Sequence, residues 1–195
     1  MGLEKFVTMP ESPRVESPQP ERMRTSQWAR WAIAIGLIVV LDQASKAWIS
    51  SLLEFGQTLP LNAWLNLVRV HNPGAAFSFL ADAGGWQKWF FIVLGLVAML
   101  WMAWMIHTNP KRPWFCAAMS LLMGGAAGNV WDRVQLGEVV DFIQVHGNWL
   151  SLVFAGGFFP SFNVADSAIS VGVVLMLVDE WRHARQFQGA EKDSA

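Results

Sequence analysis

Cysteine, tyrosine and charge are the scarce features of this chain. Its 195 residues include one cysteine, Cys116, and no tyrosine. A single cysteine excludes an internal disulfide and any metal site built from several cysteines. Charged residues make up 15% of the chain, against about 25% in ordinary soluble domains. The formal net charge is −1, so bulk charge does not favour nucleic acid, and we expect no nucleic-acid partner.

Long apolar runs take the place of the missing charge. Hydrophobic residues account for 53% of the sequence, and a helix needs roughly 20 of them to cross the ~30 Å hydrocarbon core of a bilayer. Segments of suitable length and composition occur at residues 28–53, 86–106, 114–131 and 160–178. We therefore predict a membrane-embedded, all-α bundle of four transmembrane helices within residues 28–181.

Polar tails flank this predicted bundle. Residues 1–27 are rich in Pro, Ser, Glu and Arg and cannot bury a core, so we expect a disordered tail. The length of this polar region and the lack of a small-residue cleavage site argue against a signal peptide. Lys and Arg gather in this tail, in the loop 107–113 and in the C-terminal tail 182–195. Because cytoplasmic segments carry such an excess, we expect both termini and this loop in the cytoplasm.

The stretch Gly124–Ile143 places polar side chains at the end of an apolar segment rich in small residues. Asn129, Asp132 and Arg133 are spaced i, i+3, i+4 and share one helix face. Asp141 follows among apolar neighbours. Ionisable residues are rare in membrane segments, and their default interpretation is a functional site.

Two other segments carry similar polar pairs. Asn163 and Asp166 are spaced i, i+3 at the start of the last apolar segment, and Asp42 and Lys46 are spaced i, i+4 in the first. We interpret Asp42 and Lys46 as a helix-anchoring or interhelical pair rather than a catalytic one. With both termini cytoplasmic, all these residues meet near the opposite face of the membrane.

Two carboxylates close together in an apolar site share a proton, and the pair titrates as a unit. This arrangement suits aspartic-peptidase chemistry, in which an ionised acid activates water and a protonated acid donates to the peptide carbonyl. We assign Asp141 and Asp166 to this pair, because each follows a turn or begins a helix and can face a shared cleft. Asp132 is the reserve candidate, although its neighbours favour a structural hydrogen-bond network.

Simpler interpretations of single residues stay open. Arg133 could extend to the membrane surface, Asp166 could be a charge favoured by the helix dipole, and Asn163 could only cap that helix. Asp141 could lie in an exposed strand. For the whole chain, a proton or ion transporter with a relay of acids, a scaffold subunit and a metal-dependent carboxylate site are the alternatives.

In order along the chain, the polar motifs resemble those of bacterial lipoprotein signal peptidase, signal peptidase II. They are Asp42-Gln-Ala-Ser-Lys46, Asn72-Pro-Gly-Ala-Ala-Phe77, Gly124-Gly-Ala-Ala-Gly-Asn129-Val-Trp-Asp132-Arg133, Val140-Asp141-Phe142 and Phe162-Asn163-Val-Ala-Asp166. The resemblance covers about residues 30–180. It implies an intramembrane aspartic endopeptidase that needs no metal or other cofactor. The implied reaction removes the signal peptide from diacylglyceryl-modified prolipoproteins, just before the lipidated lipobox cysteine.

By the same resemblance Asp141 and Asp166 are the catalytic residues. Supporting or substrate-binding positions are implied at Asp42, Lys46, Asn72, Gly74, Asn129, Asp132, Arg133, Asn163 and Ala165. The family also implies a small extracytoplasmic β-sheet and an interfacial helix within residues 54–85, where alternation from Thr58 to Val70 itself suggests short strands. The implied location is the bacterial inner membrane, with the site near the periplasmic face, membrane lipid as a partner, and globomycin-type inhibitors expected in the cleft.

Two features depart from the family pattern. The N-terminal tail is longer than the family needs, and Gly147–Pro160 is long for the segment between the two catalytic motifs, which suggests an extended flap. We also expect close helix packing around Gly124–Gly128 to wall the substrate pocket and to select small residues before the cysteine.

Overall fold

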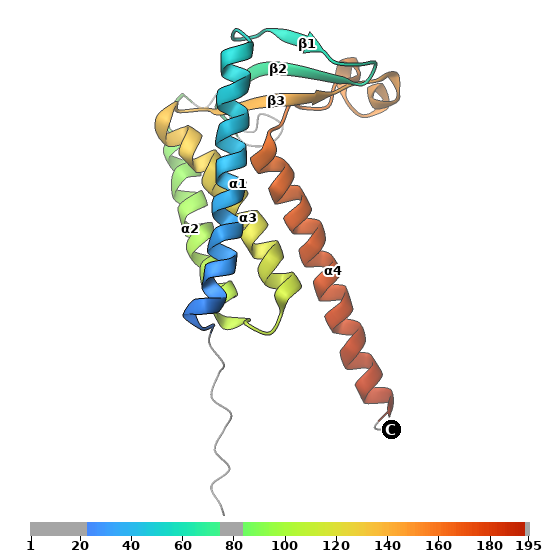
Figure 1. Ribbon diagram of the computed structural model, residues 1–195. Coiled ribbons are helices and arrows are strands. Elements are labelled where there is room, and N and C mark those ends of the chain that lie inside the picture. Colours follow the sequence, from blue (N-terminus) through green and yellow to red (C-terminus); the bar gives the residue numbers. More distant parts are fainter. Residues whose placement is uncertain (1–22, 75–83, 194–195) are drawn as a thin grey trace, which may run out of the picture.

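The computed structural model describes residues 23–74 and 84–193. Its helices are α1 (Thr25–Leu52), α2 (Gln87–Thr108), α3 (Pro113–Gln135) and α4 (Val164–Asp193). They form an elongated bundle with a small sheet at one end (Figure 1). The predicted N-terminal tail lies mostly outside the described residues, although its last residues already belong to α1. Helix α4 begins after residue 160 and continues past residue 178, through most of the predicted C-terminal tail.

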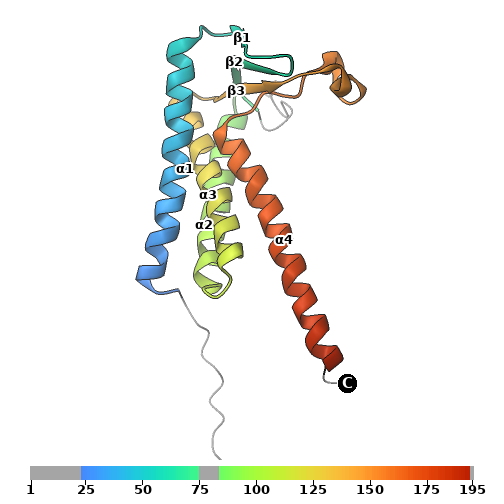
Figure 2. The same ribbon diagram turned by 45° about the vertical axis from the view of Figure 1, so that its right-hand side comes forward.

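Helix α3 is the central element of the bundle. It packs against α1, α2 and α4, and the two views in Figures 1 and 2 show it enclosed by them. Glycine makes these contacts close: a Cβ atom at Gly124 would lie 2.8 Å from Ile38 Cβ, and one at Gly125 would lie 2.4 Å from the Ala165 carbonyl oxygen. Small residues at helix interfaces allow this approach where lipid gives no hydrophobic driving force between helices.

The outer surfaces of the helices are strongly apolar. Leu37 in α1, Leu100 in α2 and Val174 in α4 are 57%, 73% and 61% exposed. Exposed apolar side chains at this density are unfavourable in water and favourable in lipid. By length and composition, α1 and α2 are candidate membrane spans.

A three-stranded antiparallel sheet covers the end of the bundle where α1 and α3 end and α4 begins (Figure 1). Its strands β1 (Thr58–Pro60), β2 (Leu65–Asn72) and β3 (Val139–Val145) are ordered β1-β2-β3. The short strands predicted between Thr58 and Val70 are confirmed. Residues 54–74 otherwise form turns and bends. The expected interfacial helix is therefore absent from residues 54–74, and residues 75–83 lie outside the described part of the chain.

Two short 3-10 helices follow β3, η2 (Asn148–Leu152) and η3 (Ala155–Gly157). The backbone folds back on itself here: the Gly147 N–H donates to the Gly157 carbonyl oxygen at 2.9 Å. This compact loop accounts for the long segment between the motifs that contain Asp141 and Asp166. It is neither a continuous strand nor a helix.

Candidate active site

Pairing between β3 and the approach to α4 creates the site. The Ile143 N–H donates to the Phe162 carbonyl oxygen at 2.8 Å, and the Phe162 N–H donates back to the Ile143 carbonyl oxygen at 3.0 Å. This antiparallel bridge fixes the start of α4 beside the middle of β3. Asp141 on β3 and Asp166 in the first turn of α4 are thereby brought to one place, although they are distant in the sequence.

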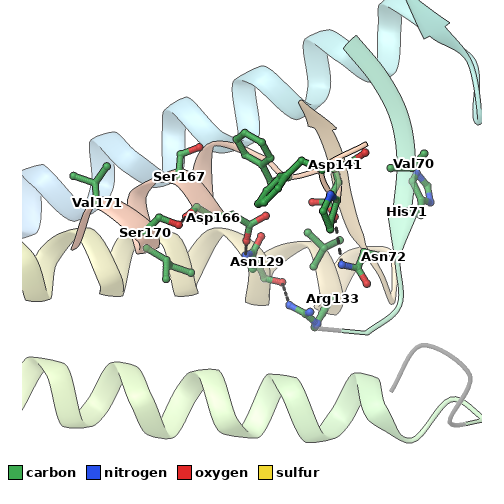
Figure 3. Close-up of a pocket in the computed structure, with 16 residues that line it drawn as sticks. Val70, His71, Asn72, Asn129, Arg133, Asp141, Asp166, Ser167, Ser170 and Val171 are labelled. Carbon is green, nitrogen blue, oxygen red and sulfur yellow. Dashed lines mark hydrogen bonds between the residues drawn. The ribbon is translucent and has the colours of Figure 1, made fainter. Parts of the chain in front are cut away.

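The amides of Asn129 and Asn163 join these acids, and Figure 3 shows the hydrogen bond from Asn129 to Asp166. Asn163 Nδ2 donates to Asp141 Oδ1 at 2.8 Å, while Asn163 Oδ1 accepts from the Asp166 N–H at 2.9 Å. Asn129 Nδ2 donates to Asp166 Oδ1 at 2.8 Å, and its Oδ1 accepts from Asn163 Nδ2 at 3.2 Å. Asn163 therefore caps α4 and also holds Asp141, so the cap-only interpretation is incomplete.

Asp141 is buried, with 3% of its surface exposed, and does not lie in an exposed strand. Burial raises the pKa of Asp141 from the usual 3.8 to about 7, and the negative charge of Asp166 adds to the rise. Hydrogen bonds from Asn72 and Asn163 oppose it. Within the described part of the chain, no Lys or Arg lies at ion-pair distance from either acid. Asp141 therefore retains a proton near neutral pH.

The acids face a cavity of about 920 Å³. Its walls come from the ends of β2 and β3, from α3, from the residues before α4 and from the first turns of α4. Figure 3 shows Asp166, Ser167 and Ser170 on the α4 side and Asn72 with Asp141 on the sheet side. A cavity of this size accommodates several residues of an extended peptide, and its two acids lie at the wall.

A second polar cluster lies behind the cavity. Lys46 Nζ lies 2.7 Å from Asp42 Oδ2 and 2.8 Å from Asp132 Oδ2, and all three residues are buried. Lys46 also donates to Asn129 Oδ1 at 3.3 Å. The other Asp132 contacts include the Val140 N–H, which donates to Asp132 Oδ2 at 3.1 Å. The cluster links α1 and α3 to the start of β3, which is the structural network expected for Asp132.

Asp42 ties this cluster to α4. The Ala165 N–H donates to Asp42 Oδ1 at 2.9 Å, so a carboxylate from α1 satisfies a free amide in the first turn of α4. Gly128 leaves room for this contact, since a Cβ there would lie 2.5 Å from Asp42 Oδ2. The expectation that Gly124–Gly128 walls the pocket is wrong: none of these residues lines the cavity, because they face neighbouring helices instead.

Arg133 connects α3 to the end of β2. Its Nη2 donates to the Gly74 carbonyl oxygen at 2.6 Å, and its guanidinium lies 5.0 Å from the Phe91 ring centroid. Asn72 Oδ1 accepts from the Gly74 N–H at 3.0 Å, and Asn72 Nδ2 donates to Asp141 Oδ2 at 3.4 Å. Arg133 is 8% exposed, so it holds this turn and does not extend to the membrane surface.

Sequence reasoning missed several residues of the site. Gln43 Nε2 donates to Asp132 Oδ1 at 2.8 Å, and an amide next to Asp42 inside an apolar segment was a usable signal. Ser170 lies one turn after Asp166 and lines the cavity, as does Phe159. No pattern in the sequence identifies Phe159, because aromatic residues are frequent throughout the chain. Among residues 23–74 and 84–193, no three His, Cys, Asp or Glu side chains group so as to hold a metal ion.

Comparison with known proteins supports the resemblance seen in the motifs. The family described as signal peptidase II matches residues 34–182. A lipoprotein signal peptidase of Cupriavidus pinatubonensis is 46% identical over 159 residues, which cover 82% of this chain and 85% of that protein. A lipoprotein signal peptidase of Cellvibrio japonicus is 38% identical over 170 residues, 87% of this chain and 96% of that protein.

Solved structures share the fold. A bacterial membrane enzyme determined by the in meso method at 2.3 Å resolution is 28% identical, with a TM-score of 0.67 over 80% of this chain and 90% of that one. A second, at 1.9 Å resolution, is 27% identical with a TM-score of 0.63, over 82% of this chain and 96% of that one.

Proposed function

Since the chain belongs to the signal peptidase II family, we propose that Asp141 and Asp166 are the catalytic residues of its peptidase reaction. The family consists of aspartic peptidases. The protein removes the signal peptide from diacylglyceryl-modified prolipoproteins, cleaving just before the lipidated cysteine. The observation that carries the proposal is the pair of acids at one cavity wall, joined through Asn129 and Asn163, with no Lys or Arg of the described residues in an ion pair with either acid.

In the proposed reaction one acid donates a proton and the other accepts one. The protonated Asp141 donates a hydrogen bond to the scissile carbonyl oxygen, which polarises the carbonyl carbon, and transfers its proton to that oxygen as the carbon is attacked. The ionised Asp166 accepts a proton from a water molecule as that water attacks the carbon. The tetrahedral intermediate collapses when Asp166 returns the proton to the leaving amide nitrogen, so the C–N bond breaks. Asp141 recovers its proton as the new carboxyl group forms.

The remaining polar residues position this pair. Asn129 and Asn163 hold the two carboxyl groups at fixed orientations, and Asn72 supports Asp141 from the sheet side. The cluster of Asp42, Lys46 and Asp132 fixes the helix ends on which Asn129 and Asp166 lie. Arg133 with Gly74, and Ala165 through its N–H, complete the supporting set. These groups act through the acids and do not themselves exchange protons with the substrate.

We further propose that α1, α2, α3 and α4 all span the inner membrane, with both termini cytoplasmic and the sheet on the periplasmic side. The apolar outer surfaces of the helices and the basic loop between α2 and α3 support this orientation. The cavity then opens where the helices meet the sheet. A diacylglyceryl-cysteine held in the outer leaflet reaches it by lateral diffusion, and globomycin-type inhibitors would occupy the same cavity.

Cleavage of a purified diacylglyceryl-prolipoprotein tests the catalytic assignment. In detergent with EDTA, wild type should cleave, and Asp141→Asn and Asp166→Asn should each lose at least roughly 10²- to 10⁴-fold in rate, because each removes a proton-transfer group. Asp179→Asn is the matched control, since this acid lies about halfway along α4, does not line the cavity and pairs with Arg112. Near-normal cleavage by either dyad variant would overturn the assignment and direct attention to Asp132.

A further inference from the structure

The loop between β3 and α4 carries an apolar surface that no other part of the described chain covers. We call residues 147–157 the flap. Trp149, Leu152 and Val153 are 66%, 90% and 76% exposed. Figures 1 and 2 both show the flap at the end of the sheet away from α1, extending sideways beyond the helices. Large apolar side chains grouped at an exposed tip indicate a binding surface.

The flap is a built structure with an inner and an outer side. Its ends are closed by the hydrogen bond between Gly147 and Gly157, as in an Ω-loop. Leu150 is buried on the inner side, and the Phe154 ring packs edge-to-face on Phe159 with centroids 5.2 Å apart. The exposed side chains are therefore held outward by a packed interior.

The side chains of the flap indicate which kind of partner its exposed surface binds. Residues 142–165 contain no Asp, Glu, Lys or Arg, so the flap offers no charged group to a protein or nucleic acid partner. Its exposed residues are aliphatic, with a tryptophan whose ring and N–H suit the headgroup boundary of a bilayer. The Trp149 indole folds over Gly147, where a Cβ would lie 2.5 Å from Nε1, and so lies along the flap surface.

We infer that the flap inserts its tip, Leu152 and Val153 with Trp149, into the outer leaflet beside the active-site cavity. The inference rests on the proposed orientation of the bundle. The chain passes from the flap through Phe159 and Phe162, which both line the cavity, directly into α4. Since α4 begins at the membrane boundary in that orientation, a loop extending sideways at this level meets lipid. Insertion holds the Phe159 wall at the depth where a lipidated cysteine enters.

Single-site fluorescence in proteoliposomes tests this inference. Cys116 is fully buried, so an introduced surface cysteine is the reactive thiol in the folded protein, and unmodified wild type gives the background. An environment-sensitive fluorophore is attached at Leu152→Cys in vesicles of phosphatidylcholine and phosphatidylglycerol. Val174→Cys on the exposed surface of α4 is the lipid reference, and Asn62→Cys on the exposed turn between β1 and β2 is the water reference.

The expected result is strong quenching at Leu152→Cys by lipids with nitroxide-labelled tails and weak quenching by iodide, as at Val174→Cys. Water-like behaviour at Leu152→Cys, with Val174→Cys in lipid, overturns the inference and leaves the proposed function intact. Protection from both quenchers that varies with the protein-to-lipid ratio overturns it in favour of a contact between two copies. Water-like behaviour at Val174→Cys instead refutes a membrane-spanning α4, on which the flap inference and the proposed orientation of the bundle both rest.

Discussion

The protein contains two groups of buried acids that lie side by side and differ in one respect. Asp42 and Asp132 share Lys46, whereas Asp141 and Asp166 share only asparagine amides and a cavity. A cation between two carboxylates balances part of their charge and holds both in place. Amide donors alone leave the second pair with a proton to exchange. The paired charges hold the helices, and the unpaired acids are left free for chemistry.

The largest effect on stability should follow from removing the shared cation. Lys46→Met leaves Asp42 and Asp132 buried and unpaired, and breaking a buried pair in this way costs about 3–5 kcal/mol. The free energy of unfolding in detergent, measured by chemical denaturation, gives the value. Lys88→Met is the matched control, because Lys88 is partly exposed on α2, where its Nζ lies 5.3 Å from the Trp89 ring centroid. If Lys46→Met lowers the free energy of unfolding no more than Lys88→Met does, the proposed difference between the two groups of acids is wrong.

Replacing an acid of the proposed catalytic pair should raise the stability of the protein instead of lowering it. The pKa of Asp141 is about 7 in the folded protein and 3.8 without the fold, so the folded state binds more protons between these values. The free energy of unfolding therefore falls as pH rises through that window, by at most about 1.4 kcal/mol per unit, or roughly 4 kcal/mol in all. Asp141→Asn removes the titration and should raise stability at about pH 8.

Thermal unfolding as a function of pH measures this difference. The wild-type Tm should decline between pH 3.8 and about 7, and the Asp141→Asn profile should be flatter across the same range. The peptidase rate of wild type should fall as pH rises through about 7, because Asp141 then loses the proton that it donates. Parallel Tm profiles for the two proteins would show that Asp141 is not the group that titrates.

Local sequence patterns predicted which helices form the bundle better than they predicted where each helix begins and ends. The apolar length of a span is a property of one segment, and the i, i+4 spacing of Asp42 and Lys46 already places them together. Helix α4 starts later than predicted, because Phe162 pairs with Ile143 on β3. The length of the segment after β3 suggested a flap, but its internal structure could not be predicted. The Gly147–Gly157 hydrogen bond and the burial of Leu150 depend on contacts that the apolar run does not encode.

The site shows the same limit on a smaller scale. The spacing of Asn129, Asp132 and Arg133 predicts one shared helix face, yet their side chains separate. Asn129 binds Asp166, Asp132 binds Lys46, and Arg133 turns to a backbone carbonyl. Their partners come from α4, α1 and the end of β2, so the division depends on how three distant segments pack. Sequence spacing identified the residues, and tertiary contacts set their roles.

Substitution of Gly128 should have an intermediate effect on stability, and it distinguishes a role in helix packing from a role in substrate selection. In Gly128→Ala the new Cβ would meet Asp42 Oδ2 at 2.5 Å, and overpacking of this kind costs about 1–3 kcal/mol. Gly36→Ala is the control, since nothing lies within 4 Å of its Cβ position on α1. Because Gly128 does not line the cavity, the relative rates for substrates with alanine or leucine before the cysteine should be unchanged. A shift in that preference would restore the pocket-wall hypothesis.

The smallest effect on stability is expected where one cation pairs with two acids at a site exposed to solvent. Arg112 bonds to Asp179 and Glu180 at the far end of the bundle, as Lys46 bonds to Asp42 and Asp132 inside it. Arg112 is 23% exposed and Glu180 is 53% exposed, so solvent screens the charges. Arg112→Gln should cost about 0–1 kcal/mol, and this cost should shrink as salt is added. The cost of Lys46→Met should not change with salt, because its ion pairs are shielded from solvent. If both substitutions cost the same free energy of unfolding and both costs fall with salt, ion pairing alone sets the stabilisation. If Lys46→Met costs more and only the cost of Arg112→Gln falls with salt, burial explains the difference.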